Sequence, residues 1–219
     1  GFWRAIRELG IDYQIVTGSS VGALNASLMA SGKFDEAIDM WTSITTPDII
    51  NTSPTRLSQI IDTKALAASL KGLVGDVGEN AVNLKMDPFP LSALIDRLFS
   101  EETIRESGIE VGVMTTEYPI LRSAPFILKD IPFGSLKDYL LASATVYPSM
   151  EPKVIGNKKY IDGGYSDLMP VNMALDMGAE DIIAVELNDS GIMVKYQTHY
   201  PVRTIKPHFD LGPSMVFNP

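Results

Sequence analysis

The stretch DYQIVTGSSVGALNAS, residues 12–27, joins an aliphatic run to a Gly-Ser-Ser-Val-Gly turn and then to small, helix-compatible residues. We expect a buried strand over residues 11–17, followed by a helix over about residues 21–31 that ends at Gly32. A strand, a tight turn and a helix in this order favour an α/β fold. The turn itself can be the mount of a nucleophile or a glycine-rich packing corner.

The turn has the pattern G-x-S-x-G, with Ser20 at its centre. A nucleophile on a strand-to-helix elbow occupies a strained turn, so small residues are expected two positions before and after it, here Gly18 and Gly22. At a helix start, unpaired N–H groups and the helix dipole favour developing negative charge. The pattern therefore indicates Ser20 as a candidate nucleophile.

Composition narrows the classes of function. The chain has 219 residues, 45% of them hydrophobic and 21% charged, which is typical of one globular domain. With a net charge of −9 and scattered basic residues, it has no stripe for nucleic acid and no attraction to anionic lipid, so any transient membrane contact must be apolar. No apolar stretch approaches the length of a transmembrane helix. Both a cytoplasmic and a secreted location are compatible, with the cytoplasm slightly preferred.

Helical and strand patterns alternate along the chain. We expect a single domain over residues 1–219 with a largely parallel sheet, and a lid or variable insertion in the turn-rich and glycine-rich residues 45–90. Ser135 is the expected N-cap of one helix and Pro170 the opening residue of another. The expected helices are residues 2–9, 34–44, 57–72, 91–99, a short one after 100, 135–145 and 170–177, and the further strands are residues 109–116, 126–131, 154–161 and 182–187.

A second candidate site is Asp162-Gly163-Gly164, which follows the expected strand 154–161. Asp before two glycines is an ordinary turn signal, but a serine nucleophile needs a group that accepts its proton. Asp162 can be that group. So can His199 or His208, because the chain order Ser, Asp, His matches that of α/β-hydrolases, although several strands precede the elbow in those enzymes and at most one does here. A Ser-His-Asp esterase or thioesterase therefore stays open as an alternative.

Three segments resemble the patatin-like phospholipase family: GFWRAIRELGI at residues 1–11, IVTGSSVGALNAS at 15–27, and residues 140–188 around the Asp-Gly-Gly sequence. The resemblance implies a three-layer α/β/α fold and a lipid acyl hydrolase that needs no cofactor and no metal. Separately, the acidic, Lys-poor composition suggests a bacterial protein. Carried over by position, Ser20 is the nucleophile and Asp162 the partner carboxylate. The supporting turn glycines are Gly18, Gly22, Gly163 and Gly164. The substrate is an ester-linked acyl chain, which Ser20 accepts and water releases.

The resemblance also implies an oxyanion hole from a glycine-rich loop, expected upstream of Gly1, and this chain is expected to lack that loop and the first strand. Losing such donors lowers the rate on the order of 100-fold or more, so residues 1–219 alone are expected to be almost inactive. A third possibility is a non-catalytic lipid-binding module. The apolar channel near Ser20 can draw on Met29, Trp41, Phe89, Phe99, Met114, Met150, Met169 and Met173.

Overall fold

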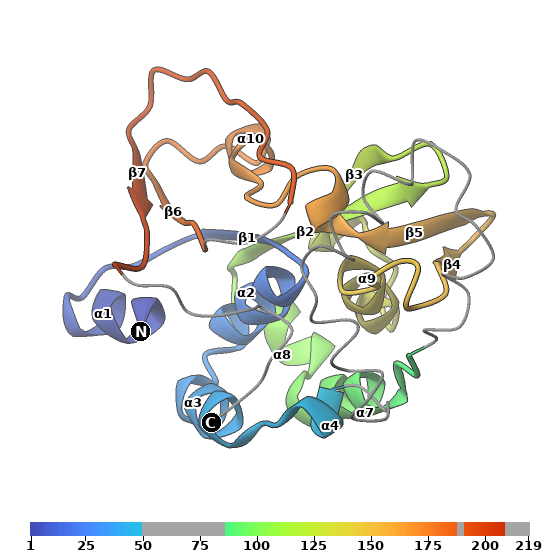
Figure 1. Ribbon diagram of the computed structural model, residues 1–219. Coiled ribbons are helices and arrows are strands. Elements are labelled where there is room, and N and C mark those ends of the chain that lie inside the picture. Colours follow the sequence, from blue (N-terminus) through green and yellow to red (C-terminus); the bar gives the residue numbers. More distant parts are fainter. Residues whose placement is uncertain (50–85, 188–190, 209–219) are drawn as a thin grey trace.

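The computed structural model describes residues 1–49, 86–187 and 191–208 (Figure 1). Its helices are α1 (Phe2–Glu8), α2 (Val21–Ser31), α3 (Phe34–Ser43), α4 (Thr46–Ile49), α7 (Phe89–Leu98), α8 (Glu101–Glu106), α9 (Leu136–Ser143) and α10 (Val171–Asp176), with 3-10 turns η2 (Leu128–Asp130) and η3 (Gly163–Tyr165). Its strands are β1 (Ile15–Ser19), β2 (Glu110–Tyr118), β3 (Arg122–Ile127), β4 (Lys153–Ile155), β5 (Lys158–Asp162), β6 (Ile182–Val185) and β7 (Val202–Ile205). The expected helix over 57–72 lies outside the described residues, as does most of the expected lid over 45–90.

The central sheet is mixed, which corrects the expectation of a largely parallel one. In the described residues β1 pairs with β2 in parallel, whereas β3 and β5 pair with β2 antiparallel and β4 pairs with β5 antiparallel. A separate two-stranded sheet joins β6 and β7 in parallel. Two hairpins, β2–β3 and β4–β5, account for two of the three antiparallel pairings, because a connection of two or three residues can join only antiparallel strands.

Three expected strands have other bounds in the structure, two of them because of these hairpins. The single strand expected over 154–161 is two strands, with Gly156 at a φ of 63° in the turn between them. A Gly-Asn pair between two short runs is a hairpin signal. The strand expected over 126–131 instead runs from Arg122 to Ile127, and a 3-10 turn follows it. The strand expected over 11–17 begins later, at Ile15.

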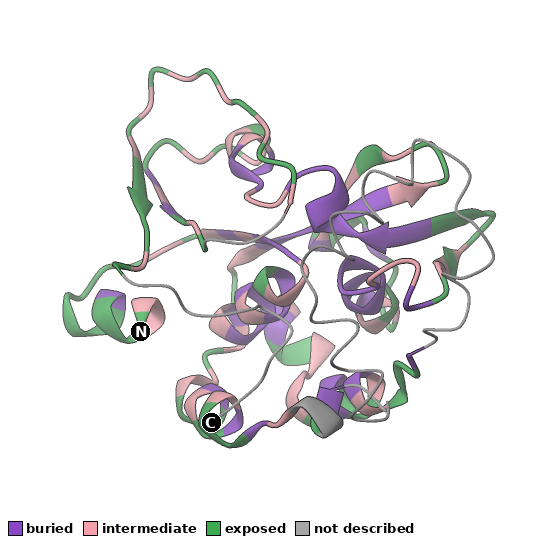
Figure 2. Cartoon of the chain, in the orientation of Figure 1, coloured by how far each residue is buried: buried purple, intermediate pink, exposed green. Residues whose placement is uncertain are grey.

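The hydrophobic core lies between the sheet and the helices α2, α7 and α9. Leu28 of α2, Leu140 of α9 and Val113 of β2 are fully buried within it, and Figure 2 shows how α2 and α9 turn their buried residues inward. A smaller cluster joins α10 to β6 through Val171 and Ile182. In the view of Figure 1, α10 lies on the other side of β1 from α2.

Four helices are followed by a glycine in the left-handed region. Gly32 ends α2, as predicted, and Gly10, Gly108 and Gly178 follow α1, α8 and α10 with positive φ in the same way. Ser135 is the N-cap of α9, as predicted, but its side chain makes no capping hydrogen bond. Instead the carboxylate of Glu101 accepts the Leu136 N–H at 3.0 Å, since α8 packs beside the start of α9.

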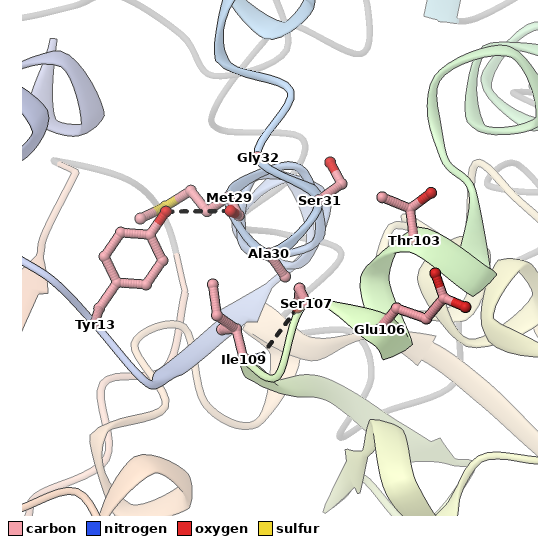
Figure 3. A pocket seen from close by; sticks show the side chains of 9 residues that line it. All are labelled: Tyr13, Met29, Ala30, Ser31, Gly32, Thr103, Glu106, Ser107 and Ile109. Atoms are coloured by element: carbon pink, nitrogen blue, oxygen red, sulfur yellow. Dashed lines mark hydrogen bonds between the residues drawn. The ribbon is translucent and has the colours of Figure 1, made fainter.

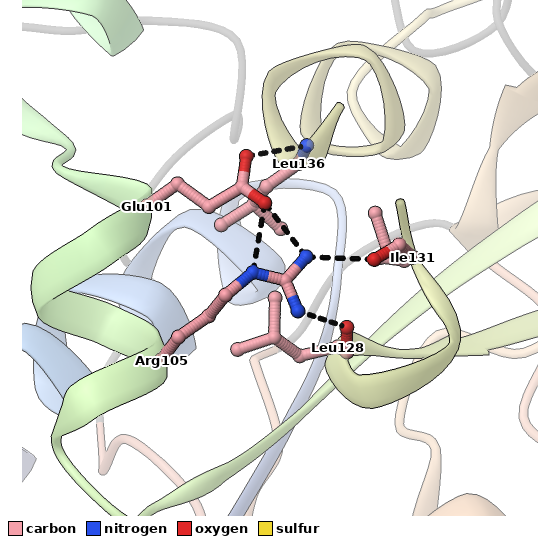
Figure 4. A network of polar contacts seen from close by, with 5 residues as sticks. All are labelled: Glu101, Arg105, Leu128, Ile131 and Leu136. Carbon is pink, nitrogen blue, oxygen red and sulfur yellow. Dashed lines mark hydrogen bonds and ion pairs between the residues drawn. The ribbon is translucent and has the colours of Figure 1, made fainter. Parts of the chain in front are cut away.

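Glu101 belongs to a polar network that ties α8 to η2 and α9 (Figure 4). The Arg105 guanidinium donates two hydrogen bonds to one Glu101 oxygen, at 2.6 and 2.9 Å. It also donates to the carbonyl oxygens of Leu128 and Ile131, at 2.9 and 2.7 Å. The Arg105 and Glu101 side chains together therefore hold three segments of the chain in place.

Candidate active site

Ser20 stands between the end of β1 and the start of α2, at a backbone conformation of φ 55° and ψ −128°. Only two described residues other than glycine have positive φ, and Ser20 is one of them. Such a conformation costs on the order of 1–3 kcal/mol and marks a place that the surrounding structure holds in a strained state. The predicted elbow is therefore present as a strand, a strained residue and a helix.

Gly18 permits this elbow. A Cβ atom at Gly18 would lie 2.1 Å from the carbonyl carbon and oxygen of Gly22, a clash of side chain with backbone. A Cβ atom at Gly22 itself would meet nothing within 4 Å. The expectation that both flanking residues must be small thus holds for Gly18 and is wrong for Gly22.

Asp162 is the last residue of β5, and only 7% of it is exposed. Its Oδ1 accepts the Gly164 N–H at 2.8 Å, so the carboxylate begins the η3 turn. A Cβ atom at Gly163 would lie 2.4 Å from the Met114 carbonyl oxygen and 2.5 Å from Ser19 Oγ. The Asp-Gly-Gly sequence therefore turns in a space that admits no side chain at its second position.

The sheet brings the two turns together. Because β3 occupies one edge of β2 from Gly112 to Glu117, β1 and β5 must share the other edge. On that edge Ser19 pairs with Met114 and Asp162 pairs with Thr115. The strands β1 and β5 therefore meet with their C-terminal ends at two successive residues of β2, about 3.4 Å apart along the strand.

Three tyrosines lie beside the aspartate turn. Tyr118 donates a hydrogen bond to the Tyr147 hydroxyl at 3.1 Å, and Tyr165 donates one to the Tyr147 carbonyl oxygen. The hydrogen bond from Tyr118, together with burial, raises the pKa of Tyr147 to about 12. Burial, with the charge of Asp162 as a smaller cause, raises the pKa of Tyr165. Both phenols therefore stay protonated near neutral pH and do not act as bases.

Asp167 is a buried carboxyl group that the sequence did not single out. It is 3% exposed, and its Oδ1 has no hydrogen-bond partner in the described part of the chain. Burial raises its pKa to about 6, against an opposing hydrogen bond from the Met169 backbone. No motif marks this residue, because its burial comes from the packing of the η3 turn.

The two histidines lie in the segment after β6. Both side chains are exposed, and His199 stacks on Tyr200 with ring centroids 4.1 Å apart. Within the described residues neither imidazole makes a hydrogen bond to Ser20. The arrangement gives no support to a histidine as the proton acceptor.

An open cleft of about 490 Å³ lies at the opposite end of α2 from the elbow (Figure 3). Tyr13, which precedes β1, lines it together with the last turn of α2 and the end of α8. An 11-residue helix is about 16 Å long, so this cleft is separate from Ser20. Met29, an expected lining residue of an acyl channel, belongs to this cleft instead.

The other expected channel residues divide between core and surface. Met114, Met150 and Met173 are buried, and Met173 packs against Gly112. Phe89 is 69% exposed. Trp41 donates a hydrogen bond to the Asn25 side chain at 2.8 Å. These residues therefore do not line one common channel.

The described residues contain no group of three or more His, Cys, Asp or Glu side chains that could hold a metal ion. Among them, no helix is both long enough and apolar enough to cross a bilayer.

Comparison with known proteins adds the family. The family model described as patatin-like phospholipase matches residues 1–175, which include the elbow and the Asp-Gly-Gly turn. The chain belongs to the patatin-like phospholipase family. This patatin-like chain shares about a quarter of its aligned residues with its curated relatives.

Those relatives include mammalian and bacterial proteins. The chain is 25% identical over 189 residues to mouse patatin-like phospholipase domain-containing protein 7, and 25% identical over 191 residues to human patatin-like phospholipase domain-containing protein 6. It is 23% identical over 192 residues to an uncharacterized NTE family protein of Mycobacterium tuberculosis. These matches cover 85% to 87% of the chain, but 12% of each mammalian protein and 45% of the bacterial one.

Proposed function

We propose that this chain is the catalytic part of a lipid acyl hydrolase in which Ser20 is the nucleophile and Asp162 takes its proton. The observation that carries the proposal is the meeting of β1 and β5 on one edge of β2, with Ser19 Oγ against Gly163. The strained backbone of Ser20 and the family membership add support.

The reaction begins when Ser20 Oγ attacks the carbonyl carbon of an ester while its proton passes to the Asp162 carboxylate. The tetrahedral intermediate then expels the alcohol, which takes that proton, and leaves the acyl group on Ser20. In the second half, water gives a proton to Asp162 and its oxygen attacks the acyl carbon. The fatty acid leaves, and the proton returns to Ser20 Oγ. One carboxylate thus serves both halves without an imidazole.

Charge develops on the carbonyl oxygen in both halves. The first N–H groups of α2 lie directly after Ser20, where the helix dipole favours negative charge. From the family resemblance, further donors are expected from a glycine-rich loop ahead of α1. The assays below use the full-length protein.

The proposed substrate is an ester-linked acyl chain of a lipid, reached through transient contact with a lipid surface. A short p-nitrophenyl ester and a phospholipid separate chemistry from access, because the first needs only the reacting groups. Hydrolysis of both substrates is measured by product release.

The decisive comparison uses Ser20→Ala and Asp162→Asn. Each change should lower kcat for the short ester by about 1000-fold or more, because the nucleophile or its base is gone. His199→Ala and His208→Ala are the matched controls and should stay within about threefold of the unmodified protein. If one histidine variant loses activity as Ser20→Ala does, the Ser-His-Asp alternative is right and the dyad is wrong. If Asp162→Asn keeps its activity, the proposed aspartate base is wrong.

A further inference from the structure

The end of α9 contacts the backbone of the elbow. Ser143, the last residue of α9, is fully buried, and its Oγ accepts the backbone N–H of Ser20 at 2.9 Å. The same hydroxyl donates to the carbonyl oxygen of Met114 at 2.6 Å. A single hydroxyl therefore links α9, β2 and the strained residue.

The Ser20 N–H lies between a strand and a helix, and neither element accepts a hydrogen bond from it. The paired part of β1 ends at Ser19, and α2 begins at Val21, so neither the strand ladder nor the helix supplies an acceptor for it. The hydroxyl of Ser143 satisfies this donor. The N–H lies in the plane of the Ser19–Ser20 peptide, so this hydrogen bond fixes the orientation of that plane. The bond therefore also restrains the φ angle of Ser20 and the direction in which the Ser20 side chain leaves the backbone.

The same short segment holds the aspartate turn. Two residues beyond Ser143, the Thr145 carbonyl oxygen accepts the backbone N–H of Asp162 at 2.9 Å. Thr145 is itself fastened to α9, because its hydroxyl donates to the Leu141 carbonyl oxygen at 2.7 Å. Residues 143–145 thus hold the backbone N–H groups of both residues of the proposed dyad.

We propose that Ser143 is a positioning residue, whose hydroxyl keeps Ser20 in the strained conformation that turns its Oγ toward the acceptor of its proton. This inference rests on the proposed function. A displacement of about 1 Å at a reacting group lowers a rate on the order of 100-fold, so the loss of this one hydrogen bond affects catalysis more than folding.

The test compares Ser143→Ala with Ser27→Ala in the complete protein. Ser27 is also fully buried, and its hydroxyl donates to the Ala23 carbonyl oxygen at 3.0 Å inside α2 without a bond to the elbow. Both variants should lower Tm by a similar few degrees. Only Ser143→Ala should lower kcat for the short ester, by about 10- to 100-fold with KM within twofold.

Two further readouts separate positioning from damage to the fold. The rate at which a fluorophosphonate labels Ser20 should fall in parallel with kcat in Ser143→Ala and stay unchanged in Ser27→Ala. Ser143→Thr keeps the hydroxyl and should retain kcat within about fivefold, and it answers the question even if the alanine variant does not fold.

The outcomes are distinct. Equal kcat in Ser143→Ala and Ser27→Ala, with Ser20→Ala inactive, overturns the positioning role and leaves the proposed function intact. A Ser143→Thr variant that folds but is as slow as Ser143→Ala also overturns it, because the hydroxyl would then have no effect. Full activity of Ser20→Ala overturns the proposed function and the positioning role together.

Discussion

Ser19 and Asp162 occupy successive positions on one edge of β2, although 143 positions separate them in the sequence. Each strand blocks the path of the other, so neither chain can continue along the edge. The residue after Ser19 must leave the sheet at once, which accounts for the strained Ser20, and the residues after Asp162 turn into η3. The topology thus creates the elbow and the aspartate turn at a single point.

Strain at Ser20 predicts an unusual order of stability. Glycine adopts a φ of 55° without the clash of a Cβ atom, so Ser20→Gly should unfold at higher urea than Ser20→Ala, by about 1 kcal/mol in the free energy of unfolding. At Ser92, inside α7, the order should reverse, because glycine weakens a helix interior by about 1 kcal/mol relative to alanine. The strain is absent if glycine is the less stable variant at both positions.

The close approach of the Gly22 backbone to Gly18 predicts that one added methyl group at Gly18 strongly destabilises the fold. In Gly18→Ala the new Cβ meets the Gly22 backbone at 2.1 Å, so β1 and the start of α2 must separate. We expect a loss of about 3 kcal/mol or more in urea unfolding, together with the loss of esterase activity. Gly22→Ala is the control, since its Cβ has open space. Equal stability of the two alanine variants would show that the elbow accommodates a side chain at Gly18.

Local signals in the sequence predicted much of the fold. The sequence predicts the elbow, the helix over 34–44 and the glycines that end helices, because each depends on residues within one turn of the chain. Gly18 could be predicted for the same reason. The direction of β5 could not, since it follows from a turn at Gly156 that the alternating pattern of 154–161 conceals.

Only part of the candidate site could be predicted from the sequence. Ser20 and Asp162 were found because motifs mark them and because a nucleophile needs a base. Ser143 and Asp167 carry no motif, and their surroundings come from elements far along the chain: Met114 of β2 for one, the η3 turn for the other. Such tertiary contacts cannot be inferred from a single sequence.

Burial of Asp167 predicts a pH dependence of stability. Its pKa is about 6 in the folded protein, against an ordinary value of 3.8. A raised folded-state pKa means that its stabilising contribution is complete below pH 3.8 and is lost as the pH rises through 6. Asp167→Asn removes this loss. The free energy of unfolding of the variant minus that of the unmodified protein should therefore increase between pH 4 and pH 7, by up to about 3 kcal/mol.

Urea unfolding at pH 4, 5, 6 and 7 measures this difference, in which the other titrating groups cancel. A difference that stays constant over this range would contradict a raised pKa at Asp167. A difference that falls as the pH rises would mean that the folded protein favours the charged carboxylate.

The Arg105 network predicts a requirement for the guanidinium shape. Lysine keeps the charge but cannot bond Glu101, Leu128 and Ile131 at once, so Arg105→Lys should lower the free energy of unfolding by about 2 kcal/mol. Arg122→Lys is the matched control, because Arg122 forms an exposed pair with Glu117 and should change stability by less than about 0.5 kcal/mol. Similar losses in the two variants would assign the effect to charge alone.

The most direct test of the central claim is mass spectrometric mapping of the complete protein after treatment with a fluorophosphonate. We expect one added phosphonyl group on Ser20, with labelling abolished in Ser20→Ala, slowed about 100-fold or more in Asp162→Asn, and retained in Ser19→Ala. Labelling that is unaffected by Asp162→Asn, or that falls on another residue, would contradict a serine activated by this carboxylate.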